Sequence, residues 1–67
     1  MDIKKKFGKR IKELRLQKGL TQQTLANIAN LDRTYLPSIE KGERNISITV
    51  IEKLAKALEI EIIELLK

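Results

Sequence analysis

The side chains that could do chemistry in this chain are arginine, lysine, hydroxyl and carboxylate groups. The 67 residues include no His and no Cys, which excludes an imidazole base, a thiolate nucleophile, a disulfide framework and the usual ligands of a zinc site. A chain this short leaves little room for a cleft of about 300 Å³ or more. We therefore expect no enzymatic activity, no cofactor and no metal.

The most informative group combines one arginine, two small hydroxyls and one lysine at helical spacing. With a proline, these residues share the outward face of a short helix, opposite Leu36 and Ile39: Arg33, Thr34, Pro37, Ser38 and Lys41. Such a face suits the major groove of DNA, since Arg can bind guanine O6 and N7, Thr or Ser can contact a base or a thymine methyl, and Lys can bind a phosphate. The alternative for the arginine is an ion pair with a nearby surface acid.

Positive charge is concentrated at the start of the chain. The net charge is +5, but residues 1–18 carry +6, residues 19–51 are neutral and residues 52–67 carry −1. This excess indicates a polyanionic partner, either nucleic acid or an anionic membrane surface, or else a solvated helix face that only aids solubility. The membrane alternative is the weaker one because the basic segment lacks a broad Trp or Phe face. We expect the run from Lys4 to Lys6 to be a frayed, solvated end rather than a specific arm.

Length and composition favour a single domain over residues 1–67. No apolar run approaches the roughly 20 residues that span a bilayer, and the start of the chain lacks the apolar core of a signal peptide. The absence of Cys favours a reducing compartment. The sequence therefore predicts a soluble, cytoplasmic protein without a membrane partner.

Apolar spacing predicts the first two helices. The first runs from about residue 3 to residue 18 and ends at Gly19, because apolar residues recur every three to four positions at Ile3, Phe7, Ile11 and Leu14. Thr21 is the expected N-cap of the second helix, over residues 22–29. Its residues available for burial are Leu25, Ala26 and Ile28.

A third helix is expected from residue 33 to about residue 41, capped by Asp32 and ended by Gly42. Pro37 falls at its fifth position, where its ring would clash with the carbonyl of Arg33. This predicts a kink or a partly 3₁₀ first turn. The alternative is a helix that starts near residue 36, with the proline in a favoured first-turn position. We prefer the early start because the Asp32 cap requires it.

Two further helices complete an all-α, compact five-helix bundle with no strand. Ser47 is expected to cap the fourth, which ends near residue 58, although a capping box from Thr49 to Glu52 would shift its start by two residues. The last, short helix covers residues 61–66. Leu and Ile at helical spacing should form the core everywhere except at this C-terminus, where five of seven residues are apolar and Ile63 should protrude.

The second and third helices form a helix-turn-helix candidate. Only residues 30–32 separate them, and Asn30 tolerates the left-handed backbone that a sharp reversal needs. Ala26 and Ala29 are small enough to let the two helices approach closely.

Three separated motifs carry a resemblance to a known family: Lys9-Arg-Ile-Lys-Glu-Leu-Arg15, Gly19-Leu-Thr-Gln-Gln-Thr-Leu-Ala26 and Tyr35-Leu-Pro-Ser-Ile-Glu-Lys-Gly42. They resemble the phage repressor/Cro-type (XRE) helix-turn-helix family, whose fold is the lambda repressor-like DNA-binding domain. More narrowly, Leu31-Asp-Arg-Thr-Tyr35, Ile39-Glu40 and Arg44-Asn-Ile-Ser47 are similar to controller proteins of restriction-modification systems. The resemblance implies a sequence-specific transcriptional regulator.

The resemblance also implies roles for single residues. Base edges would be contacted by Arg33, Thr34, Tyr35 and Ser38, with the alternative for Tyr35 of a half-buried ring and a wet hydroxyl. Phosphates would be bound by Gln22, Lys41, Arg44, Asn45 and Ser47. Arg15 and Glu40 occupy positions of a structural ion pair, and Glu59 stands where glycine often closes the fourth helix.

The expected partners are double-stranded DNA with a palindromic operator, a second copy of the chain and, as a further contact, RNA polymerase. Members of the family commonly dimerise through the C-terminal region, which places Ile63 and Leu66 in the interface of a homodimer. Two recognition helices about 34 Å apart would then read a two-fold symmetric site. The competing hypothesis is an antitoxin or protein-interaction module with the same fold.

Overall fold

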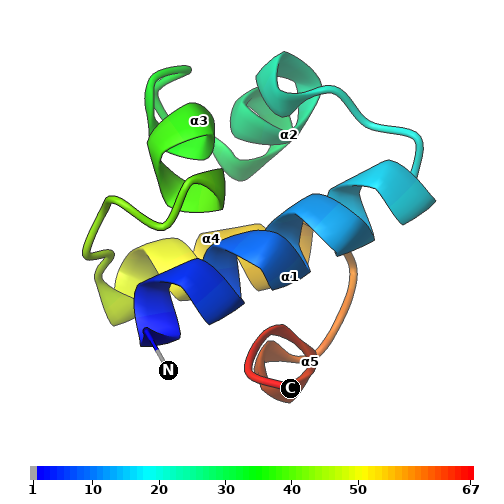
Figure 1. Ribbon diagram of the computed structural model, residues 1–67. Coiled ribbons are helices and arrows are strands. Elements are labelled where there is room, and N and C mark those ends of the chain that lie inside the picture. Colours follow the sequence, from blue (N-terminus) through cyan, green and yellow to red (C-terminus); the bar gives the residue numbers. More distant parts are fainter. Residues whose placement is uncertain (1) are drawn as a thin grey trace.

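The computed structural model describes residues 2–67, and within them it contains five helices and no strand. They are α1 (Ile3–Gln17), α2 (Gln22–Ala29), α3 (Tyr35–Glu40), α4 (Ile48–Ala57) and α5 (Ile62–Leu65). In Figure 1, α1 crosses the front of the molecule, α2 and α3 lie above it, and α5 lies below. The predicted all-α class is confirmed. No helix in the described part of the chain is both long and apolar enough to cross a membrane.

One apolar core joins all five helices. The helix-turn-helix of α2 and α3 packs against two other helices: α3 contacts α1, and α2 contacts α4. In addition, α2 and α3 pack against each other, and α4 packs against α5. Twelve apolar side chains are buried in this core: Phe7, Ile11, Leu14, Leu25, Ala26, Ala29, Leu36, Ile39, Leu54, Ala55, Leu58 and Leu65.

Four of the helices end in the same way, with a residue in the left-handed conformation. These residues are Gly19, Asn30, Gly42 and Glu59. In each case the next backbone N–H donates back to a carbonyl five residues earlier, which satisfies an orphan acceptor of the last turn. The left-handed Asn30 (φ 57°, ψ 47°) is confirmed as the pivot between α2 and α3. Glu59 adopts φ 57° without being glycine.

The predicted N-caps of α2 and α4 are confirmed. Thr21 Oγ1 accepts from the backbone N–H of Thr24 at 3.0 Å. Ser47 Oγ accepts from the backbone N–H of Val50 at 3.2 Å, so the alternative start at Thr49 is wrong.

The predicted early start of α3 is wrong. The helix begins at Tyr35, so Pro37 is its third residue and its missing N–H is one that would have no partner inside the helix. The proline therefore causes no kink, and the alternative start near residue 36 was closer to the structure. Asp32 closes the turn that precedes α3. Its Oδ1 accepts from the backbone N–H of Thr34 at 2.8 Å and from the Thr34 hydroxyl at 2.7 Å, and its carbonyl accepts from the N–H of Tyr35 at 3.0 Å, a bond of 3₁₀ type.

Four apolar residues outside the C-terminus are exposed, which corrects the predicted core. Ile28 is 55% exposed and Ala29 is buried in its place, because Ile28 lies about 100° around α2 from Ala29. Ile3 and Ile48 lie at the first positions of α1 and α4, beyond the cover of neighbouring helices, and Leu16 lies in the last turn of α1.

Candidate nucleic-acid interface

A buried ion pair connects α1 to the helix-turn-helix. Arg15 Nε donates to Glu40 Oε2 at 2.7 Å, and Nη2 donates to Oε1 at 3.1 Å. The two side chains are only 10% and 5% exposed. Arg15 Nη1 also donates to the carbonyl of Leu20 at 2.7 Å, and Gln22 Nε2 donates to Glu40 Oε1 at 3.0 Å. One carboxylate therefore fixes α1, the start of α2 and the end of α3 relative to one another.

The turn before α3 presents the two residues expected to touch bases. Arg33 and Thr34 are both exposed, and Arg33 forms no ion pair within residues 2–67. The Thr34 N–H and hydroxyl both donate to Asp32, and these hydrogen bonds hold the pKa of the Asp32 carboxyl below its usual 3.8. The hydroxyl hydrogen of Thr34 is thus engaged, while its oxygen lone pairs and methyl group remain available to a ligand.

Tyr35, Ser38 and Arg44 form one cluster on the side of α3. The Arg44 guanidinium lies over the ring of Tyr35, with Cζ 4.3 Å from the ring centre. Arg44 Nε donates to Ser38 Oγ at 2.8 Å, and Ser38 Oγ donates to the backbone carbonyl of Tyr35 at 3.0 Å. All three side chains are partly buried. The cluster holds Arg44 against α3, and its two Nη nitrogens have no hydrogen-bond partner in the described part of the chain.

The remaining residues expected to bind phosphates lie at the end of α3 and in the following loop. Lys41, Asn45 and Ser47 are exposed. Ser47 uses its oxygen to cap α4, so its hydroxyl hydrogen is free for an acceptor. These three residues follow α3 in the chain, and Gln22 lies at the start of α2, where it contacts Glu40 at the end of α3. Polar side chains next to a helix in the groove are suited to binding the DNA backbone.

Gly8 is a residue of this site that the sequence reasoning missed. It lies in the middle of α1, and a Cβ there would overlap the carbonyl oxygen of Ile39 and crowd the backbone of Glu40. The glycine lets α1 and α3 touch through their backbones and so sets the depth at which α3 sits. Its position inside an otherwise good helix was the available signal.

The C-terminal end of the molecule exposes apolar side chains. Ile63 is 64% exposed and Leu66 is 50% exposed, whereas Leu65 between them is buried. The predicted protrusion of Ile63 is confirmed.

Comparison with known proteins places this architecture in a family. Residues 11–65 match the sequence model of the helix-turn-helix family. The chain belongs to that family. The chain is 46% identical to the control protein C.MunI of a Mycoplasma species, over 96% of this chain and 88% of that protein.

Two solved structures extend the comparison. The restriction-modification controller protein C.AhdI from Aeromonas hydrophila is 53% identical, with a TM-score of 0.90 over 92% of this chain and 94% of that one. C.Esp1396I bound to a 25 base pair operator site is 43% identical, with a TM-score of 0.84 over 91% of this chain and 80% of that one. The resemblance to controller proteins is confirmed. These relatives are regulators, which also confirms the expectation that the chain is not an enzyme.

Proposed function

We propose that this helix-turn-helix protein is a sequence-specific DNA-binding transcriptional regulator of the restriction-modification controller type. The observation that carries the proposal is its likeness to a controller bound to an operator, combined with an exposed arginine and threonine at the head of α3. The polar face of α3 and the cationic residues around it match what the major groove and its flanking phosphates require.

Base recognition falls mainly to Arg33 and Thr34. Arg33 is free to bind guanine O6 and N7 as a bidentate donor, and Thr34 offers a methyl group and an acceptor. Tyr35 and Ser38 have a positioning role, because their contacts keep Arg44 on the flank of α3. Either can also reach a base edge if Arg44 swings away to a phosphate.

Phosphate binding falls to Gln22, Lys41, Arg44, Asn45 and Ser47. Gln22 stands at the first position of α2, where the positive helix end favours an anion, and Glu40 holds its amide by one N–H. The second N–H is then directed to a phosphate. Such contacts position α3 without reading sequence, and they make affinity fall steeply with salt.

The protein acts as a homodimer on a two-fold symmetric operator in this proposal. Exposed Ile63 and Leu66 supply an apolar patch at the C-terminus. Changing Ile63 to Glu should yield a monomer that binds DNA weakly, as measured by light scattering and a binding titration. Unchanged mass would refute this interface. A contact with RNA polymerase stays a prediction.

Selection of bound sequences from random duplexes tests the proposed function. We expect a two-fold symmetric motif containing a guanine whose enrichment is lost in the Arg33→Ala variant. A matched control is Lys18→Ala, which removes an exposed cation at the end of α1. Enrichment no greater than that of the starting pool would refute the proposal.

A further inference from the structure

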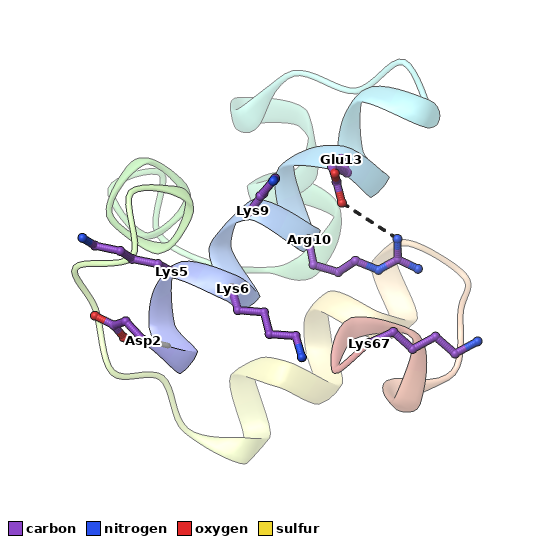
Figure 2. A pocket seen from close by; sticks show the side chains of 7 residues that line it. All are labelled: Asp2, Lys5, Lys6, Lys9, Arg10, Glu13 and Lys67. Carbon is purple, nitrogen blue, oxygen red and sulfur yellow. Dashed lines mark ion pairs between the residues drawn. The ribbon is translucent and has the colours of Figure 1, made fainter.

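A basic groove runs along the exposed side of α1 beside the C-terminus. It is lined by Asp2, Lys5, Lys6, Lys9, Arg10, Glu13 and Lys67. Its volume of about 470 Å³ corrects the expectation that so short a chain has little room for a cleft of about 300 Å³, because the groove is an open hollow between the side chains of α1 and the C-terminus. Figure 2 shows Lys5 and Lys9 extending away from α5, while Lys6, Arg10 and Lys67 lie on the side toward it. Five cations therefore share this surface with two carboxylates, and none of them belongs to the interface described above.

The five cations divide into two kinds. Arg10 contacts Glu13 and Glu64, with N to O distances of 4.0 and 3.6 Å, and also donates to the carbonyl of Glu64 at 2.8 Å. Lys67 pairs with Glu64 at 2.9 Å. Arg10 thus attaches α5 to α1, and Lys67 is paired within the C-terminal segment. Lys5, Lys6 and Lys9 form no ion pair anywhere in residues 2–67.

Two of the free lysines, Lys5 and Lys6, also occupy an unfavourable place near the N-terminus of α1. The N-terminus of an α-helix carries partial positive charge, which favours acidic side chains in the first turn. The first turn of α1 has no acidic residue, and only the Asp2 side chain caps it, through the N–H of Lys4. Lys5 and Lys6 add positive charge to this end. An anion bound here would offset both the helix dipole and the mutual repulsion of the lysines.

The groove is continuous with the proposed DNA surface. Lys5 lies directly against Gly42, the left-handed residue that follows α3. The two are so close that a Cβ on Gly42 would overlap the backbone and side chain of Lys5. Lys9 follows one turn later along α1 and so lies on the same side of the helix. Lys4, in the same turn, lines a second, smaller hollow together with Arg44 and Asn45. A path of cations thus leads from Lys41 at the end of α3 onto α1.

We infer that Lys5 and Lys9 form a second phosphate-binding surface, which holds the DNA backbone that flanks the operator. The inference rests on the proposed function, because the end of α3 is what brings the duplex to Lys5. The expectation of a frayed end over this lysine run is wrong, because α1 is helical from Ile3 onward, although Lys5 and Lys6 are exposed to solvent as expected. Its ligand is the phosphodiester backbone, without regard to base sequence.

The test compares two duplexes and two charge-matched variants. One duplex ends at the operator and the other extends about one helical turn beyond each end. The variant K5Q/K9Q removes the proposed contacts, and K18Q/K56Q removes two exposed lysines elsewhere that form no ion pair within the described residues. Circular dichroism confirms that both variants are folded.

We expect wild type and K18Q/K56Q to bind the extended duplex more tightly than the short one, and K5Q/K9Q to lose this gain. Each phosphate contact contributes about 0.9 to the slope of log affinity against log salt, so the slope on the extended duplex should fall by about 1.8 for each subunit. Equal gains for the two variants would overturn the inference while leaving operator binding intact. A groove that binds a poly-glutamate peptide but gives no flank effect would also overturn it. Absence of operator binding by wild type would instead refute the proposed function.

Discussion

Replacing Glu40 by Gln should strongly destabilise the protein. The carboxylate is 5% exposed and accepts from Arg15, itself 10% exposed, and from Gln22. The substitution leaves the Arg15 guanidinium buried without a counter-charge, which costs about 3–5 kcal/mol. A chain of 67 residues has a free energy of unfolding of roughly 3–10 kcal/mol. The variant should therefore be partly unfolded at room temperature or lose about half its stability.

Urea denaturation followed by circular dichroism measures this loss. Glu52→Gln is the matched control, because Glu52 is exposed and forms no ion pair in residues 2–67, and a change there should stay within about 0.5 kcal/mol. The double variant Arg15→Met/Glu40→Leu replaces both charges by apolar groups of similar volume and should recover most of the stability. A loss for Glu40→Gln no larger than that for Glu52→Gln would refute the reasoning.

The same double variant separates positioning from stability. We expect this variant to be folded and to lack the acceptor that holds the Gln22 amide, so its DNA affinity should fall about as far as in Gln22→Ala. Combining Gln22→Ala with the double variant should then cause little further loss. Independent, additive losses would show that Glu40 does not position Gln22.

Two further substitutions and one titration have predicted outcomes. Gly8→Ala should lower the free energy of unfolding by about 1–3 kcal/mol, because the new methyl overlaps the Ile39 carbonyl. Helix propensity alone would instead raise it by about 1 kcal/mol. The direction in which the urea midpoint shifts distinguishes the two effects. Glu59→Gly should stabilise by about 1 kcal/mol by relieving the left-handed backbone, and thermal melting against Glu59→Ala, which should not gain, checks it. The Asp32 carboxyl should titrate below 3.8 by NMR, so its contribution to stability is present above that pH and is lost as the pH falls through its lowered pKa; titration at or above 3.8 would contradict the Thr34 hydrogen bonds.

Local signals in the sequence predicted most of the fold. The bounds of α2, the left-handed Asn30 and the Ser47 cap each depend on residues within one helical turn, and the structure contains all three. The start of α3 failed for a local reason too. Asp32 has two competing uses, as a helix cap or in a turn with Thr34, and sequence spacing alone does not choose between them.

The candidate site depended more on contacts between distant residues. The Arg15 and Glu40 pair came from the family resemblance rather than from charge counting, because 25 residues separate the two partners. The stacking of Arg44 on Tyr35 and the backbone contact at Gly8 exist only once α1, α3 and the loop are packed together. Residue type showed which side chains could bind DNA, and packing determined which of them are free to do so.

The most direct test of the central claim is a cycle between Arg33 and the guanine of the selected operator. Arg33→Ala and replacement of that guanine should each cost about 1–3 kcal/mol of binding free energy. If Arg33 reads the guanine, the two changes together should cost no more than either change alone. Losses that add in full would contradict recognition of the operator by α3.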